Sequence, residues 1–167
     1  MIEVKRRLIP EIPALPSSIP SILQRIYAAR GITSNDQLER GAKSLLSFQS
    51  MHGITKAVDI LVEAIAKQTR IIVVGDFDAD GATSSALSVM AFRMMGSSNV
   101  DYLVPNRFED GYGLSPDVVD QAKEMGAEII MTVDNGVSSI EGVAAAKAYG
   151  MQVVVTDHHL PGSSLPI

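Results

Sequence analysis

Acidic residues and histidines gather in three short segments of the second half of the chain. The segments read D-F-D-A-D-G at residues 76–81, D-N-G at residues 134–136 and D-H-H at residues 157–159. Five aspartates brought close together cannot all remain ionised unless cations neutralise them. Carboxylate oxygens with one or two imidazoles suit Mn²⁺ or Mg²⁺, and a shared carboxylate allows two ions to lie ~3.5–4 Å apart. If folding brings the segments together, they form a site for two divalent cations.

Each segment also has an interpretation that needs no such site. The first matches the opening of a calcium EF-hand loop, but the twelfth position holds Leu87 and an apolar run replaces the leading helix. Asp76 and Asp78 also resemble the aspartate pair of haloacid-dehalogenase-type phosphatases, which would leave Asp80, Asp134 and the histidines unexplained. D-N-G is a common strand-to-helix turn, because Asn and Gly tolerate left-handed backbone. The position of all three segments after predicted strands favours the shared site.

The segments follow apolar, β-branched runs that are typical of buried strands. The predicted strands cover residues 70–75, 100–104, 128–133 and 152–156, and the predicted helices between them cover residues 82–95, 115–126 and 138–150. Ser115 with Pro116 begins the second of these helices, and Ser138 with Glu141 forms a capping box at the start of the third. This alternation predicts an α/β fold, a doubly wound parallel sheet with helices on both faces.

The order of the strands decides whether the segments meet. In open parallel sheets, ligands bind beyond the carboxyl ends of the strands, where the strand order reverses. If the strand at residues 100–104 lies outside the strand at residues 70–75, the other three strands become neighbours around that reversal. The three acidic segments then converge on one crevice.

The first part of the chain has a different character. Four prolines within residues 1–20 and a solvated basic run at residues 5–7 predict an extended arm. Apolar stripes predict helices over residues 22–31, 34–41 and 54–68. We therefore expect an arm and helices that pack on the catalytic domain over residues 1–69, and a catalytic domain, truncated at its C-terminal end, over residues 70–167.

Composition excludes several classes of protein. The chain has 167 residues, 46% of them apolar, and no cysteine, which excludes a disordered chain, a disulfide scaffold and a thiolate metal site. It has neither an apolar run long enough to span a membrane nor an export signal, so we expect a cytoplasmic protein. We also expect the protein to be a monomer. Residues 71–167 carry 4 Lys and Arg against 13 Asp and Glu. This acidic half would repel nucleic acid unless divalent cations dominate the local field.

The three segments, in this order, resemble the motifs of the DHH phosphoesterases, a family named after the D-H-H sequence seen at residues 157–159. The D-F-D-A-D-G segment corresponds to the first motif of the family, and D-N-G corresponds to the second. The loop P-N-R-F-E-D-G-Y-G-L at residues 105–114 is similar to that of the bacterial members that degrade single-stranded DNA. The resemblance extends over nearly the whole chain, including the N-terminal helices.

The resemblance implies a role for most of these residues. The metal ligands that it implies are Asp76, Asp78, Asp80, Asp134 and His158. Asp134 would bridge the two ions and form the catalytic pair with His159, which would touch the scissile phosphate or aid departure of the leaving oxygen. Asp157 would orient a histidine from outside the metal shell.

Other groups are expected to hold the phosphates beside the ions. Two cations would clamp a phosphodiester and activate a water for in-line attack on phosphorus. Thr83 and Ser84, with the amides at the start of the helix that follows the first segment, are expected to face a phosphate oxygen. Arg107 is expected to hold a neighbouring phosphate.

The resemblance thus implies the N-terminal catalytic part of a Mn²⁺- or Mg²⁺-dependent 5′→3′ exonuclease acting on single-stranded DNA in repair and recombination. A helicase and a single-strand-binding protein would be its partners. Family members carry a later aspartate and a second catalytic domain beyond the segment present here, so we expect this chain alone to be weakly active or inactive. Two alternatives stay open: a DHH enzyme acting on pyrophosphate or small nucleotides, and a non-catalytic module.

Overall fold

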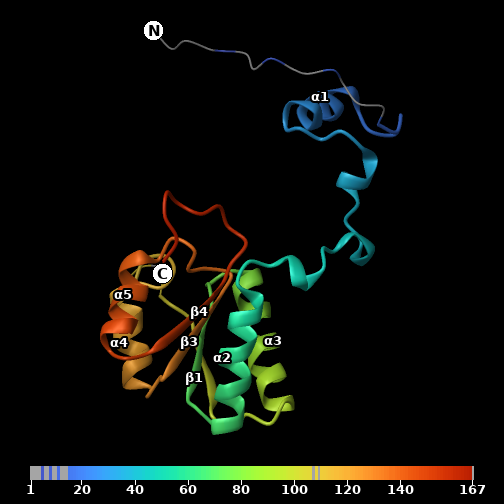
Figure 1. The fold of residues 1–167 in the computed structure, drawn as a ribbon. Coiled ribbons are helices and arrows are strands. Elements are labelled where there is room, and N and C mark those ends of the chain that lie inside the picture. Colours follow the sequence, from blue (N-terminus) through green and yellow to red (C-terminus); the bar gives the residue numbers. More distant parts are fainter. Residues whose placement is uncertain are drawn as a thin grey trace. The chain divides into compact units, whose positions relative to one another are not determined.

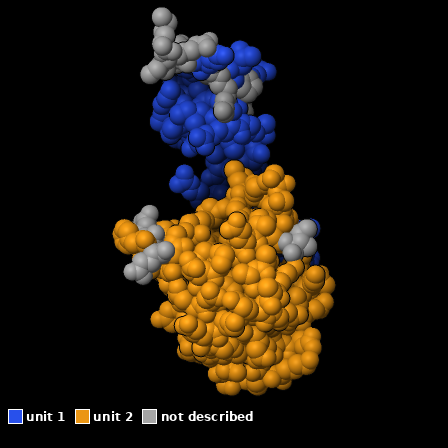
Figure 2. All heavy atoms as spheres, turned by 90° about the vertical axis from the view of Figure 1, so that its left-hand side faces the viewer, with its two compact units in different colours: residues 1–52 blue, residues 53–167 orange. Residues whose placement is uncertain are grey.

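The chain forms two compact units, residues 1–52 and residues 53–167, in the computed structural model (Figures 1 and 2). The structure describes Lys5, Leu8, Glu11, residues 15–106, Phe108 and residues 110–166. None of the helices within these ranges is long and apolar enough to cross a membrane.

The first unit contains one α-helix, α1 (Ser21–Ala29), among its described residues, followed by three short 3-10 helices. The 3-10 helices are η1 (Asn35–Leu38), η2 (Ala42–Ser44) and η3 (Phe48–Ser50). The helix predicted at residues 22–31 is confirmed as α1. The helix predicted over residues 34–41 begins after Ser34 as expected, but it forms only the four-residue 3-10 helix η1, because the backbone is already extended at Glu39.

The second unit begins with α2 (Ile54–Lys67), which packs on the core of the sheet through Ala64, Leu61 and Ile65. Val58 and Val62 of the same helix are exposed. Ala64 of this helix is buried in one core with Ile71, Val73 and Ile129. The structure therefore divides the chain between residues 52 and 53, whereas the sequence placed the division after residue 69. The helix belongs with the sheet because its apolar face has no separate core of its own.

Four parallel strands form the sheet: β1 (Ile71–Val74), β2 (Val100–Leu103), β3 (Ile129–Val133) and β4 (Gln152–Thr156). Their order is β2-β1-β3-β4, with Ile71 level with Val100 on one side and with Ile129 on the other. The chain leaves β1 in one direction to form β2 and returns to form β3 on the opposite side. The predicted reversal of strand order is thus confirmed and lies between β1 and β3.

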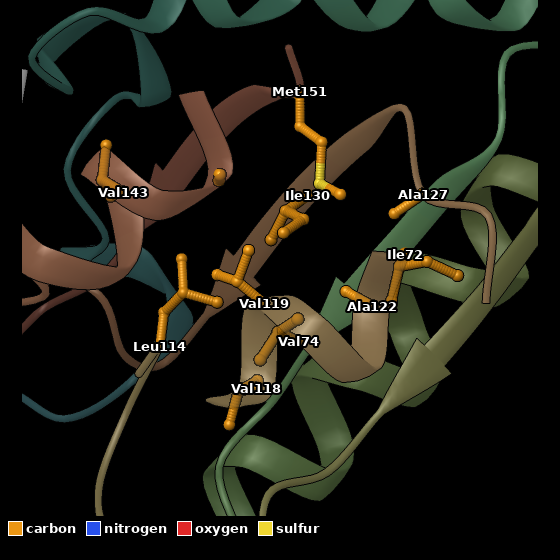
Figure 3. Packing of buried hydrophobic residues seen from close by; sticks show 11 residues of the cluster. Ile72, Val74, Leu114, Val118, Val119, Ala122, Ala127, Ile130, Val143 and Met151 are labelled. Atoms are coloured by element: carbon orange, nitrogen blue, oxygen red, sulfur yellow. The ribbon is translucent and has the colours of Figure 1, made fainter. Parts of the chain in front are cut away.

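Helices cover both faces of the sheet, as predicted (Figure 1). The helices that follow the first three strands are α3 (Ala79–Met94), α4 (Pro116–Glu124) and α5 (Ile140–Ala148). Alternate side chains of β1 face opposite cores: Ile72 and Val74 pack with α4 and α5 (Figure 3), whereas Ile71 and Val73 pack with α2 and α3. All four β1 residues are fully buried, so the strand that carries the first acidic segment is held on both faces.

The start of α4 follows from its local sequence, whereas the start of α5 involves a contact with a distant segment. Ser115 caps α4 as predicted, its hydroxyl accepting from the Val118 amide at 3.2 Å. The predicted capping box at Ser138 is wrong: Ser139 is the residue before α5, and its hydroxyl makes no cap. That hydroxyl accepts instead from the Leu114 amide at 3.1 Å, which ties the start of α5 to the loop before α4.

Candidate metal centre

The first acidic segment runs from the end of β1 into α3. Asp76 is 5% exposed, and its Oδ1 accepts from the Phe77 amide at 2.8 Å. Asp78 caps α3 through Oδ1, which accepts from the amides of Asp80 and Gly81, both at 3.0 Å. The Gly81 amide is the main cause that lowers the pKa of Asp78, and the Asp80 amide adds to it. Both carboxylates are therefore fixed by backbone donors on rigid elements.

The second segment turns sharply at the end of β3. Asp134 has a φ of 63° and so adopts a left-handed conformation, which is uncommon for a residue other than glycine. Its amide donates to the Thr156 carbonyl of β4 at 3.0 Å. Its Oδ1 lies 2.8 Å from His158 Nε2, although the Asp134 side chain is only 7% exposed. The turn thus presents a nearly buried carboxylate at the reversal of strand order.

The third segment places Asp157 beneath His159. The Asp157 side chain is 3% exposed, its Oδ2 accepts from the Val137 amide at 2.8 Å, and its Oδ1 accepts from the His159 amide at 3.0 Å. His159 Nδ1 lies 2.7 Å from the same Oδ1. Burial alone would raise the pKa of Asp157, but the hydrogen bonds from His159 and Val137 outweigh it and lower that pKa. The bond to Asp157 in turn raises the pKa of His159 against the opposing effect of burial.

We expect Asp157→Ala to lower the free energy of unfolding by about 2 kcal/mol, because the amides of Val137 and His159 lose a charged hydrogen-bond acceptor. Urea unfolding of the metal-free chain in EDTA measures this loss. Asp120→Ala is the matched control: that exposed carboxylate accepts only from the Tyr149 hydroxyl in the described contacts, and its removal should cost less than about 0.5 kcal/mol. Equal unfolding midpoints for the two variants would contradict the structural role of Asp157.

Five of the side chains form two overlapping groups of metal donors. One group contains Asp76, Asp78 and Asp134, the other contains Asp134, His158 and His159, and in each the donor atoms lie within 4.8 Å of one another. Three carboxylates in one group are a donor set that suits Mn²⁺ or Mg²⁺, and the two imidazoles of the other group favour a transition-metal ion such as Mn²⁺ over Mg²⁺. Asp134 is common to both groups. The residues present therefore fit a pair of cations that share one carboxylate.

Some residues predicted for the site lie apart from these groups. Within the described residues, neither donor group includes Asp80, which stands in the first turn of α3. Thr83 and Ser84 lie on the same helix, but their hydroxyls donate back to the carbonyls of Ala79 at 2.8 Å and Asp80 at 2.6 Å. Arg107 lies outside the described residues. The structure thus brings together aspartates and histidines at the strand ends and leaves Asp80, Thr83 and Ser84 outside both donor groups.

A cleft of about 1080 Å³ opens beside the donor groups. Its lining includes Asp76, Asp78, Asp157 and His159, together with residues 136–142 at the start of α5. Tyr112 also lines it, with its hydroxyl 3.4 Å from His159 Nδ1 and the two rings edge to face. Burial first, and then the surrounding aspartates, raise the pKa of Tyr112, so its hydroxyl stays protonated. Three of the five metal donors, Asp76, Asp78 and His159, therefore line an open cleft.

Sequence reasoning did not select Tyr112 or the start of α5 as parts of the site. Tyr112 lies in the loop at residues 105–114, so the similarity of that loop to known exonucleases was the available signal. The residues at the start of α5 carry no chemical signature, and their place in the cleft follows from the position of β4 beside β3.

Comparison with known proteins identifies the class of this fold and site. The model of the DHH family's N-terminal domain matches residues 70–167, and the chain belongs to this family. It is similar to the single-stranded-DNA-specific exonuclease RecJ of Escherichia coli, with 59% identity over 165 residues, which are 99% of this chain and 29% of that protein. The chain therefore spans less than a third of the length of that relative.

Two solved structures are similar to this one. An exonuclease RecJ bound to manganese matches with a TM-score of 0.67 and 34% identity, over 74% of this chain and 31% of that one. RecJ from Thermus thermophilus in complex with Mn²⁺ matches with a TM-score of 0.62 and 29% identity, over 84% of this chain and 19% of that one. The fold predicted from the sequence is confirmed by these matches.

Proposed function

We propose that this chain is the N-terminal catalytic part of a 5′→3′ exonuclease that hydrolyses phosphodiester bonds of single-stranded DNA. The observation that carries the proposal is the shared position of Asp134 in two groups of metal donors at the reversal of strand order. The names of its relatives, single-stranded-DNA-specific exonucleases, support the substrate. Their manganese-bound structures support the metal.

Asp76 and Asp78 would hold one ion, His158 the other, and Asp134 both. Such ions, when bound, polarise a phosphodiester and supply a nucleophilic water at neutral pH. Asp80, exposed in the first turn of α3, would complete the first site by turning its side chain towards Asp78. Bound cations would neutralise these carboxylates, which otherwise repel one another and DNA. The acidic surface could then bind DNA.

His159 would act on the phosphodiester itself. Asp157 accepts a hydrogen bond from Nδ1, which fixes the ring and leaves Nε2 for the substrate. The hydrogen bond to Asp157 also favours the protonated ring, the form that can donate a proton to the leaving oxygen. Tyr112, whose hydroxyl lies 3.5 Å from Nε2, borders the same position. Thr83, Ser84 and Arg107 are proposed to contact the neighbouring phosphates.

Metal binding gives the first test. We expect calorimetric titration with Mn²⁺ to saturate near two ions per chain, since the described residues form two donor groups. Asp134→Asn should lose this binding, and Asp101→Asn, a change of the same charge on β2 outside both donor groups, should keep it. Binding of no ion by the unmodified chain would contradict the proposed site.

The substrate is tested by comparing turnover with Mn²⁺ on single-stranded DNA, duplex DNA, pyrophosphate and a cyclic dinucleotide. We expect only slow hydrolysis by this chain alone, dependent on Asp134 and confined to single-stranded DNA. Asp134-dependent hydrolysis of pyrophosphate or the dinucleotide, with none of DNA, would support the small-nucleotide alternative instead. Rapid digestion of DNA would contradict the expected weak activity of the chain alone.

The remaining expectations are also proposals. A helicase and a single-strand-binding protein as partners, a monomeric state and a cytoplasmic location are supported by composition and by resemblance to the family. Pull-down from an extract with the immobilised chain tests the partners, and sedimentation tests the monomeric state.

A further inference from the structure

The turn that carries Asp134 is strained at the residue that both donor groups share. Among the described residues, only Gln68 and Asp134 combine a side chain with a positive φ. Left-handed backbone is unfavourable for residues with a Cβ atom, so neighbouring contacts must hold it in place. On one side, the Asp134 amide donates to Thr156 of β4. The other side depends on the next residue.

Asn135 is fully buried and bridges the ends of two strands. Its Nδ2 donates to the carbonyl of Val74, the last residue of β1, at 3.1 Å. The same nitrogen donates to the carbonyl of Val133, the last residue of β3, at 2.9 Å. These two strands flank the reversal of strand order, so one amide group fixes the gap across which the acidic segments face each other.

Two further features show that this arrangement is not simply good packing. Asn135 Oδ1 is buried and accepts no hydrogen bond from the described residues, which is an unfavourable state for an amide oxygen. Gly136 follows with a φ of 107°, and a Cβ atom there would stand 2.6 Å from Thr132 Oγ1. Costs of this kind gather at functional sites, where a particular geometry is needed.

We propose that Asn135 is a positioning residue that locks Asp134 in its left-handed conformation and thereby directs one carboxylate into both donor groups. The inference rests on the proposed metal-dependent function. Asn135 then contributes to the metal affinity of the folded chain in addition to any contribution to the stability of the fold. A side chain that only joined β1 to β3 would change the stability of the chain and leave the affinity of the folded chain for metal unchanged.

Asn135→Ser is the variant of choice, because a serine hydroxyl is too short to reach both carbonyls. We expect its Mn²⁺ affinity to fall about 10- to 100-fold, the range for groups that orient metal ligands. Electron paramagnetic resonance at saturating Mn²⁺ should change from the signal of an exchange-coupled pair, which a shared carboxylate permits, to that of isolated ions. Val100→Ala is the control, since it removes a buried side chain at the far end of the sheet.

The outcomes separate this inference from the proposed function. The inference is supported if Asn135→Ser binds Mn²⁺ more weakly than the unmodified chain while Val100→Ala binds it with unchanged affinity. The urea midpoint of Asn135→Ser must then be no lower than that of Val100→Ala, so that lost stability does not explain the weaker binding. Unchanged affinity and an unchanged pair signal in folded Asn135→Ser overturn it alone. No binding by the unmodified chain overturns it together with the proposed function. If Asn135→Ser does not fold, Asn135→Thr, which fills more of the volume and keeps one hydroxyl donor, is measured at the same Mn²⁺ concentrations and decided by the same criteria.

Discussion

Asp134→Asn is expected to abolish binding of the metal pair while leaving the metal-free fold intact or slightly more stable. Asp134 supplies a donor to both groups, so its loss weakens two sites with one substitution. The effect should exceed the roughly 100-fold that marks the upper range for groups that merely orient ligands. Calorimetric titration with Mn²⁺ measures it directly. Binding of two ions with unchanged affinity would show that Asp134 is not the shared ligand.

The stability of the metal-free variant separates this role from a structural one. Without cations, Asp76, Asp78 and Asp134 hold carboxylates within 4.8 Å of one another, and their repulsion opposes folding. Removing one charge should raise the free energy of unfolding by about 0.5–1 kcal/mol, the scale of partly exposed charge pairs. Urea unfolding in EDTA gives this value. A large loss of stability would instead mark Asp134 as part of a structural network.

Asparagine is the better replacement because of the backbone at this position. It tolerates the φ of 63°, and its amide oxygen can still meet His158. Alanine would add the strain of a left-handed conformation that it does not favour, at a cost of roughly 1 kcal/mol, and would thus hide the relief of repulsion. The comparison of the two variants in EDTA therefore measures the strain at the turn.

Gly81→Ala is expected to destabilise the chain by about 3 kcal/mol, the upper range for overpacking. The usual effect of this change inside a helix is the opposite, a gain of up to ~1 kcal/mol. Here a Cβ atom would stand 2.3 Å from the carbonyl oxygen of Asp76 and 2.5 Å from its nitrogen. Because these are backbone atoms, no side-chain rotation can relieve the contact, and the end of β1 must move.

The same displacement should reach the metal centre. Asp76 belongs to the first donor group, and Gly81 donates its amide to Asp78 of that group. We therefore expect weaker Mn²⁺ binding together with the lower urea midpoint. Met94→Ala, an 85% exposed position at the other end of α3, should change the free energy of unfolding by less than about 0.5 kcal/mol. An increase in stability for Gly81→Ala would show that this close contact does not exist.

Much of the fold is determined locally by the sequence. The runs that form β1 and β3 are short, apolar and β-branched, and each is bounded by glycine or polar residues, so their extended conformation and burial follow from residue type. The run that forms β4 has the same character, but at the edge of the sheet only Val154 is buried. Ser115 and Pro116 specify the start of α4 through a bond within one turn of helix. The acidic segments directly follow strands, and parallel strands align their carboxyl ends, so the edge of the sheet that carries the chemistry was also predictable.

The tertiary structure alone decided how these elements meet. The position of β2 outside β1 depends on which strands pair, and these strands are far apart in the chain. This pairing determines which acidic segments become neighbours. Three further features depend on a partner that is distant in the chain or on the other side of a turn. They are the left-handed turn at Asp134, the close contact of Gly81 with Asp76, and the hydrogen bond from the Leu114 amide to the Ser139 hydroxyl. Residue type and spacing describe local preferences, and such contacts exist only once separate segments have packed together.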